Sequence, residues 1–96
     1  MAALSKNEIQ EQLKKMAGWS YAGRAIHRKF TFRSFMPGID FVNKIAAAAE
    51  EAGHHPDITI NYNVVTISLS THSEGGVTSK DFELAQKIAG LAETMM

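Results

Sequence analysis

The stretch from Ile58 to Leu69 reads ITINYNVVTISL and alternates apolar with polar side chains in two runs. Alternation with a period of two is typical of β-strands that bury one face. A two-residue turn at Asn63-Val64 would bring the apolar residues of both runs to the same face, although Val64 suits such a turn poorly. The cross-strand pairs that this turn predicts are Tyr62 with Val65, Ile60 with Ile67, and Ile58 with Leu69.

Another hairpin is expected over residues 18–32, before the first one in the chain. Phe30 and Phe32 lie on the same face of an extended chain, and Ala22-Gly23-Arg24 has the composition of a turn. Arg28 interrupts the apolar alternation of the second strand. Such an interruption indicates a β-bulge or an edge position.

Three segments carry helical signals, and each begins at a residue that can cap a helix. The caps are Ser5 in the capping box Ser5-x-x-Glu8, Ser34, and Thr78 in Thr78-x-x-Asp81. Gly18 and Gly53 are expected to end the first two helices. The apolar faces predicted for the three helices are Ile9, Leu13 and Met16; Phe35, Ile39, Val42, Ile45, Ala46, Ala49 and Ala52; and Phe82, Ala85, Ile88, Ala89, Ala92 and Met95.

The order of elements is therefore α-β-β-α-β-β-α, which predicts an α+β fold. Because each strand pair has one apolar face, the simplest packing is a four-stranded antiparallel sheet with three helices on one face. The chain has 96 residues, which is enough for one modest core. We expect a single domain over residues 1–96.

Composition excludes several classes of function. The absence of cysteine excludes disulfide scaffolds, thiolate zinc sites, iron–sulfur clusters and cysteine nucleophiles. Lys+Arg and Asp+Glu are both 10, so no general electrostatic affinity for nucleic acid or anionic membranes is expected. No targeting signal and no membrane span is recognised in the sequence, and a cytoplasmic location is the expectation.

Histidine is the side chain whose unperturbed pKa lies near neutrality, and the chain has four. His54-His55-Pro56 lies between a helix end and a strand start, where two adjacent residues cannot both point into a core. In the predicted hairpin, the end of strand 64–72 returns beside the start of strand 57–63. His72 is therefore expected beside the histidine pair, whereas His27 is interpreted as a solvated surface residue.

These residues also allow other interpretations. Imidazole is a common metal ligand. However, adjacent histidines rarely chelate one ion together, and no His-Glu-x-x-His spacing accompanies them. A metal site is therefore disfavoured, while ordinary surface or hydrogen-bonded histidines stay an alternative to a functional cluster. Asp81 has a purely structural interpretation as a capping partner of Thr78.

The arrangement resembles the pterin-4a-carbinolamine dehydratase family. The motif residues are Glu50-x-x-x-His54-His55-Pro56, then Tyr62, Ser70-Thr71-His72 and Asp81. The supporting residues are Trp19, Arg24-Ala25-Ile26, Phe30-x-Phe32-x-x-Phe35 and Asn63. The resemblance covers nearly the whole chain, and no motif position departs from it.

The resemblance implies a lyase that dehydrates 4a-hydroxytetrahydropterin to quinonoid dihydropterin, and so recycles the pterin cofactor of aromatic amino acid hydroxylases. It implies that the catalytic residues are His54, His55 and His72, and that the substrate-binding residues are Glu50, Pro56, Thr71 and Asp81. We hypothesise that His54 binds the pterin ring while His55 and His72 transfer protons. No metal and no other cofactor is expected.

The resemblance also implies a homodimer or homotetramer with a small-molecule pterin as its partner. Direct nucleic-acid binding and membrane association are not expected, because the charges balance and no membrane span is recognised. An alternative is a non-catalytic oligomerisation or assembly partner of the same fold, acting like a coactivator or chaperone. The alanine-rich helix over 34–53 could pack against a second subunit in that case. A carrier that binds pterin without accelerating its reaction is a third possibility.

Overall fold

Two β-hairpins and three α-helices make up most of residues 2–95, which the computed structural model describes. In chain order the elements are α1 (Lys6–Leu13), β1 (Ser20–Ala22), β2 (Ala25–Thr31), α2 (Phe35–Ala52), β3 (Asp57–Asn61), β4 (Val64–Leu69), the 3-10 helix η1 (His72–Glu74) and α3 (Ser79–Met95). The predicted α+β class and the order α-β-β-α-β-β-α are confirmed.

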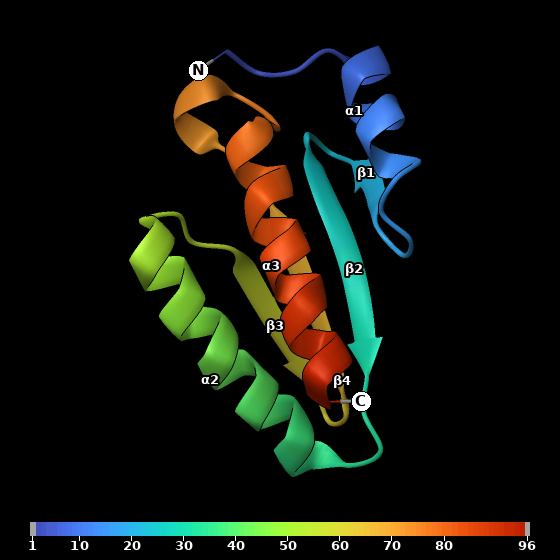
Figure 1. Cartoon of the computed structure of the whole chain (residues 1–96), viewed down its shortest axis with the longest axis vertical. Coiled ribbons are helices and arrows are strands. Elements are labelled where there is room, and N and C mark those ends of the chain that lie inside the picture. Colours follow the sequence, from blue (N-terminus) through green and yellow to red (C-terminus); the bar gives the residue numbers. More distant parts are fainter. Residues whose placement is uncertain (1, 96) are drawn as a thin grey trace.

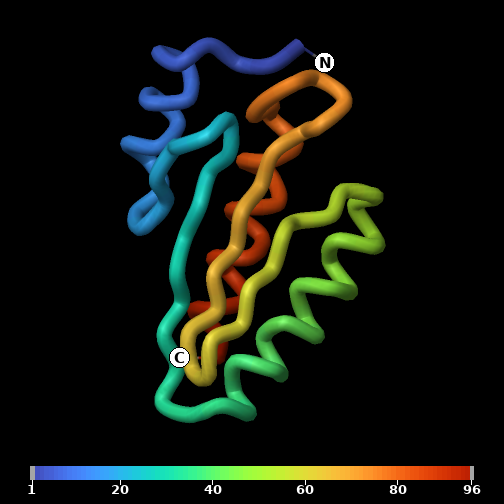
Figure 2. The backbone as a smooth tube through the Cα atoms, turned by 180° about the vertical axis from the view of Figure 1, so that it is seen from behind, coloured from blue at the N-terminus to red at the C-terminus, as the bar shows by residue number. Residues whose placement is uncertain are grey.

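The four strands form one antiparallel sheet in the order β1-β2-β4-β3. Pairing of β2 with β4 joins the two hairpins, so β1 and β3 are the edges. Figure 1 shows α3 running along one face of the sheet in front of β4, with α2 beside β3 and α1 next to β1. The view from behind in Figure 2 shows the opposite face of the sheet without a helix over it.

The turn between β3 and β4 lies one residue earlier than the sequence predicts. Asn61 pairs with Val64, so Tyr62 and Asn63 form the turn and Ile60 pairs with Val65. Asn63 is fixed there because its Nδ2 donates to the Phe32 carbonyl at 2.7 Å, and its own carbonyl accepts from the Phe32 N–H at 2.8 Å. The register shift of two residues keeps the same strand faces together.

The first hairpin agrees with the prediction in its turn but not at Arg28. Gly23 and Arg24 both have positive φ, 58° and 65°, which is the geometry of a two-residue hairpin turn. The β2–β4 register runs unbroken through Arg28, which pairs with Ile67. The predicted bulge or edge position is therefore wrong, and Arg28 lies on an inner strand.

The helices keep most of their predicted ends and differ in their faces. The Ser5–Glu8 capping box is present, but α1 ends at Leu13, several residues before Gly18. Gly53 ends α2 as predicted, with φ 65°, whereas the Ser34 side chain makes no capping hydrogen bond. On α3, Ala89 and Met95 are only half-buried, and Leu84 joins the buried face.

The buried face of α2 is rotated from the predicted one. It consists of Gly38, Phe41, Ile45, Ala48 and Ala49, while Phe35 is 44% exposed. Gly38 lies on this buried face, and a Cβ there would make ordinary van der Waals contacts, 3.4 Å from a Val65 methyl carbon and 3.6 Å from the Phe32 ring.

The core fills the space between the sheet and the helices. Phe41 of α2 lies between two aromatic rings, with ring centroids 4.9 Å from Phe30 and 5.2 Å from Phe32. Ile67 and Leu69 of β4 and Ile88 of α3 are fully buried. Among residues 2–95, the helices are too short or too polar to cross a bilayer.

Candidate active site

His54 follows Gly53, which ends α2 in the left-handed conformation. The N–H of Gly53 donates to the Glu50 carbonyl at 3.2 Å, and the N–H of His54 donates to the Ala49 carbonyl at 3.1 Å. These bonds satisfy the last carbonyls of the helix and fix the backbone at His54. The His54 side chain is 14% exposed and contacts the first turn of α3.

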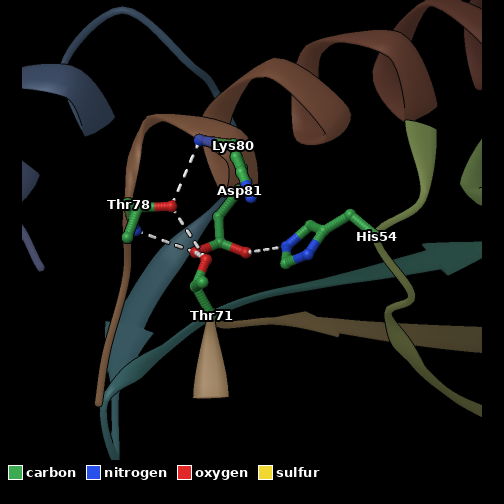
Figure 3. Close-up of polar contacts among 5 residues, drawn as sticks. All are labelled: His54, Thr71, Thr78, Lys80 and Asp81. Atoms are coloured by element: carbon green, nitrogen blue, oxygen red, sulfur yellow. Dashed lines mark hydrogen bonds and ion pairs between the residues drawn. The ribbon is translucent and has the colours of Figure 1, made fainter. Parts of the chain in front are cut away.

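Asp81 is the centre of a buried polar cluster, and its exposed fraction is 0%. His54 Nε2 lies 2.5 Å from Asp81 Oδ1 (Figure 3). The other carboxylate oxygen, Oδ2, accepts from Thr71 Oγ1 and from the Thr78 N–H, both at 2.9 Å. Buried carboxylates need such donors, because an unpaired charge in the interior is costly.

The cluster fixes the direction of each hydrogen bond. Thr71 has one hydroxyl hydrogen, which it gives to Asp81. In the 2.8 Å contact between the two threonine hydroxyls, Thr78 must therefore be the donor. Thr78 Oγ1 in turn accepts from the Lys80 N–H at 3.3 Å (Figure 3). Since Asp81 only accepts, His54 carries its proton on Nε2, and neutral His54 has a free lone pair on Nδ1.

His55 makes a second carboxylate contact at the surface. Its Nε2 bonds to Glu50 Oε2 on the last turns of α2. Both side chains are mostly exposed, 62% for His55 and 76% for Glu50. Pro56 is half-buried and leads into β3. The structure thus brings together five of the predicted site residues in two groups: His54 and Thr71 bond to the buried Asp81, and His55 bonds to Glu50 at the surface.

His72 is connected to the buried cluster through its neighbour Thr71. It is exposed at the start of η1 and lines a cavity of about 280 Å³ with Ser70 and Arg24. The predicted register would have put residue 72 level with residue 55. The observed register, extended by two residues, puts Ser70 there. No described contact joins His72 to either of the paired histidines.

A different cavity, of about 360 Å³, opens beside His54. It lies between the end of α2 and the first half of α3, and its polar lining is Lys80, Glu83 and Lys87. These three residues, together with Thr78 in the buried cluster, are not among the predicted site residues. The Thr78-x-x-Asp81 spacing could have placed Thr78 at the site. A capping box predicts a hydrogen bond between its two residues, and so it predicts that Thr78 contacts Asp81. Lys80 and Lys87 carry no comparable signal.

The chain matches known proteins along most of its length. The family described as pterin 4 alpha carbinolamine dehydratase matches residues 2–91. A relative from Sulfolobus acidocaldarius, provisionally named pterin-4-alpha-carbinolamine dehydratase, is 51% identical over 88% of this chain and 93% of its own. A relative from Nostoc punctiforme with the same provisional name is also 51% identical, over 90% and 92%.

Two solved structures have similar folds. A transcriptional coactivator/pterin dehydratase from Brucella melitensis superposes with a TM-score of 0.90 and 37% identity, covering 94% of this chain and 98% of that one. A pterin dehydratase-like protein, identified as a RuBisCO assembly factor in the alpha-carboxysome, gives a TM-score of 0.68 and 26% identity over 80% and 92%. The chain belongs to the pterin 4 alpha carbinolamine dehydratase family.

Proposed function

We propose that this protein dehydrates 4a-hydroxytetrahydropterin to quinonoid dihydropterin and water, and so returns the pterin cofactor spent by aromatic amino acid hydroxylases. The observation that carries the proposal is the buried His54–Asp81 pair. It presents an imidazole with a defined free nitrogen beside a cavity large enough for part of a bicyclic ring. Family membership supplies the substrate class.

The reaction needs two proton transfers and no redox change. One proton leaves a ring nitrogen of the substrate, the C4a–O bond breaks, and the hydroxyl departs as water after receiving a proton. His54 accepts the first proton at Nδ1, because Asp81 stabilises the imidazolium that forms and holds its tautomer. This assignment replaces the ring-binding role expected for His54 from the sequence.

The exposed histidines then deliver the second proton. His55 and His72 both face solvent, so either can exchange protons with water between turnovers. Glu50 orients the His55 ring through its Nε2 contact. Thr71 acts from behind the site, where its hydroxyl donates to Asp81 at 2.9 Å, and Pro56 leads from the two adjacent histidines into β3.

The test is the decay of enzymatically generated 4a-carbinolamine, followed by its ultraviolet absorbance. Wild type should accelerate the decay, and His54→Ala, His55→Ala and His72→Ala should each lose about 10²- to 10⁴-fold in rate. His27→Ala is the matched control. Its imidazole bonds Ser68 Oγ at 2.7 Å and the Ala22 carbonyl at 2.9 Å, away from Asp81. Decay at the spontaneous rate with folded wild-type protein would refute the proposal.

A second candidate function is an assembly or coactivator role without turnover. It is favoured by exposed apolar side chains, namely Phe35, Met36, Ile60 and Tyr62, and by the names of the two solved structures. The histidine variants distinguish the two functions. If partner binding persists in His72→Ala and wild type has no dehydratase activity, the assembly role stands and the enzyme proposal fails.

A further inference from the structure

A cavity of about 420 Å³ lies between the segment that follows α1, strand β2 and the second half of α3. It is separate from the histidine cluster: Gly90, which lines it, is nine residues after Asp81 along α3, or about 13 Å at 1.5 Å per residue. Its lining combines apolar and charged side chains, including Lys15, Met16, Trp19, Arg28 and Glu93. Nothing in the proposed dehydration uses these groups.

Arg28 is the unusual group in this cavity, because it projects from the core-facing side of an inner strand. Its neighbours on that side of β2, Ile26 and Phe30, are buried. The guanidinium carbon lies 4.4 Å from the centre of the Phe30 ring. A Cβ on Gly18, whose φ is 91°, would lie 2.8 Å from Arg28 Nε. The bare glycine therefore makes room for the cation.

Arg28 also lacks a countercharge among residues 2–95, since the ion pairs found there involve other residues. A guanidinium held against an aromatic ring keeps its N–H edges available for an acceptor. Lys15 adds a second positive charge to the lining, and Glu93 supplies the one carboxylate. The two cations and one anion leave the cavity with a positive balance.

Trp19 lines the same cavity, while its indole N–H is buried. The residue is 7% exposed, and its Nε1 is buried without an acceptor among the described residues. Buried indole N–H groups usually find a hydrogen-bond partner. Because Nε1 has almost no exposed surface, a ligand in the cavity meets the Trp19 ring and not its N–H, and Arg28 supplies the donors that such a ligand can reach.

We propose that this cavity binds a small organic acid. The carboxylate accepts two hydrogen bonds from the Arg28 guanidinium, while the apolar part of the ligand packs on Met16 and Ala89. Glu93 distinguishes two classes of carboxylate ligand, amino acids and simple carboxylic acids. An amino acid places its ammonium group near Glu93, whereas a simple acid leaves that residue in water.

Trp19 makes the test direct, because it is the single tryptophan of the chain. Its fluorescence is titrated with 3-phenylpropionate, with phenylalanine, and with the uncharged 3-phenylpropionamide. We expect a saturable change with the carboxylates and at least tenfold weaker binding of the amide. Tighter binding of phenylalanine identifies amino acids as the ligand class, and tighter binding of 3-phenylpropionate identifies simple acids. Equal affinity for the amide, or no saturable change with any probe, overturns the proposal.

Variants separate the site from general effects of charge. Arg28→Gln should weaken carboxylate binding at least tenfold, while Lys29→Gln, the next residue on the opposite face of β2, should not. Gly90→Leu is the second variant, because a Cβ at Gly90 meets no atom within 4 Å and the added side chain enters the cavity. Gly90→Leu should fold and should abolish carboxylate binding, and so it tests the site even if Arg28→Gln does not fold. Unchanged binding in Gly90→Leu refutes the site.

Discussion

At the scale of single residues, Asp81 is a carboxylate that needs hydrogen-bond donors because it is buried in the interior. Its carboxylate is fully buried and accepts from a histidine, a threonine hydroxyl and a backbone N–H. The proposed chemistry depends on it only indirectly, because Asp81 is a positioning residue that selects which nitrogen of His54 carries the proton. A substitution that keeps its shape but changes its hydrogen-bonding capacity tests that role.

Asp81→Asn should lower the dehydration rate by about 10²- to 10⁴-fold. The amide oxygen can still accept from Thr71 and Thr78, but the amide NH₂ would then face His54 Nε2. His54 would have to carry its proton on Nδ1 and could no longer accept one there. Nitrogen NMR of the imidazole reports the tautomer of His54 directly. If Asp81 had only a structural role, the substitution would leave this tautomer unchanged.

Asp57→Asn is the matched control, since Asp57 is exposed at the start of β3. Its rate and the His54 tautomer should equal those of wild type. If Asp81→Asn loses activity while the proton of His54 stays on Nε2, the positioning role is wrong.

At the scale of elements, the glycine that ends α2 positions the site. Gly53 has φ 65°, where other residues are strained by about 1–2 kcal/mol, whereas Gly90 lies within α3 with open space at its Cβ. Gly53→Ala should therefore lower the free energy of unfolding by about 1 kcal/mol, and Gly90→Ala should raise it by a similar amount. Urea denaturation measures both; a change of the same sign in the two variants contradicts this account of the helix end.

The N-terminus of α1 gives a dependence on pH. The Ser5 N–H donates to Glu8 Oε1 at 2.8 Å, and this bond, with the Ser5 side chain, lowers the pKa of Glu8. A lowered pKa stabilises the fold above the unfolded-state pKa, and that contribution is lost as pH falls through the folded-state pKa. Glu8→Gln should remove this part of the acid destabilisation seen in melting temperatures. Glu11→Gln, an exposed neighbour on the same helix, should keep it.

The sequence predicts the elements better than their faces and registers. Capping residues such as Ser5 and Gly53 act on their own helix ends, so a short stretch of sequence is enough to recognise them. The face of α2 depends instead on how Phe41 packs against Phe30 and Phe32. The β3–β4 turn depends on Asn63 bonding to Phe32, 31 residues away. These contacts exist only after the chain has folded, and so a local pattern does not contain them.

The same distinction applies to the candidate site. The histidine motif and Asp81 stand out in the sequence because their residue types suit acid–base chemistry. The pairing of His54 with Asp81 and of His55 with Glu50 could not be derived from spacing, and the expected adjacency of His72 depended on a register that was off by two residues.

At the scale of the whole molecule, edge strand β3 favours a homo-oligomer. Its outer backbone edge has no neighbouring strand in the sheet, and Ile60 is 40% exposed on it. Unprotected apolar edges promote pairing with another chain. We expect sedimentation to give a mass above the 10.5 kDa of one chain, and Ile60→Lys to reduce it toward the monomer.

Thr59→Lys is the matched control, because Thr59 is exposed on the same strand and points to the other face of the sheet. It should leave the mass unchanged. A wild-type protein that stays monomeric at all concentrations, or an unchanged mass in Ile60→Lys, contradicts association through this edge.

The His54–Asp81 bond also has a kinetic meaning. It joins residues 27 positions apart, and the segment between them contains β3, β4 and η1. Closing so long a loop is entropically unfavourable until the intervening hairpin has shortened the distance between its ends. The imidazole signal of His54 should therefore reach its native value late in refolding, after the hairpin amides are protected from exchange, and so report completion of the fold.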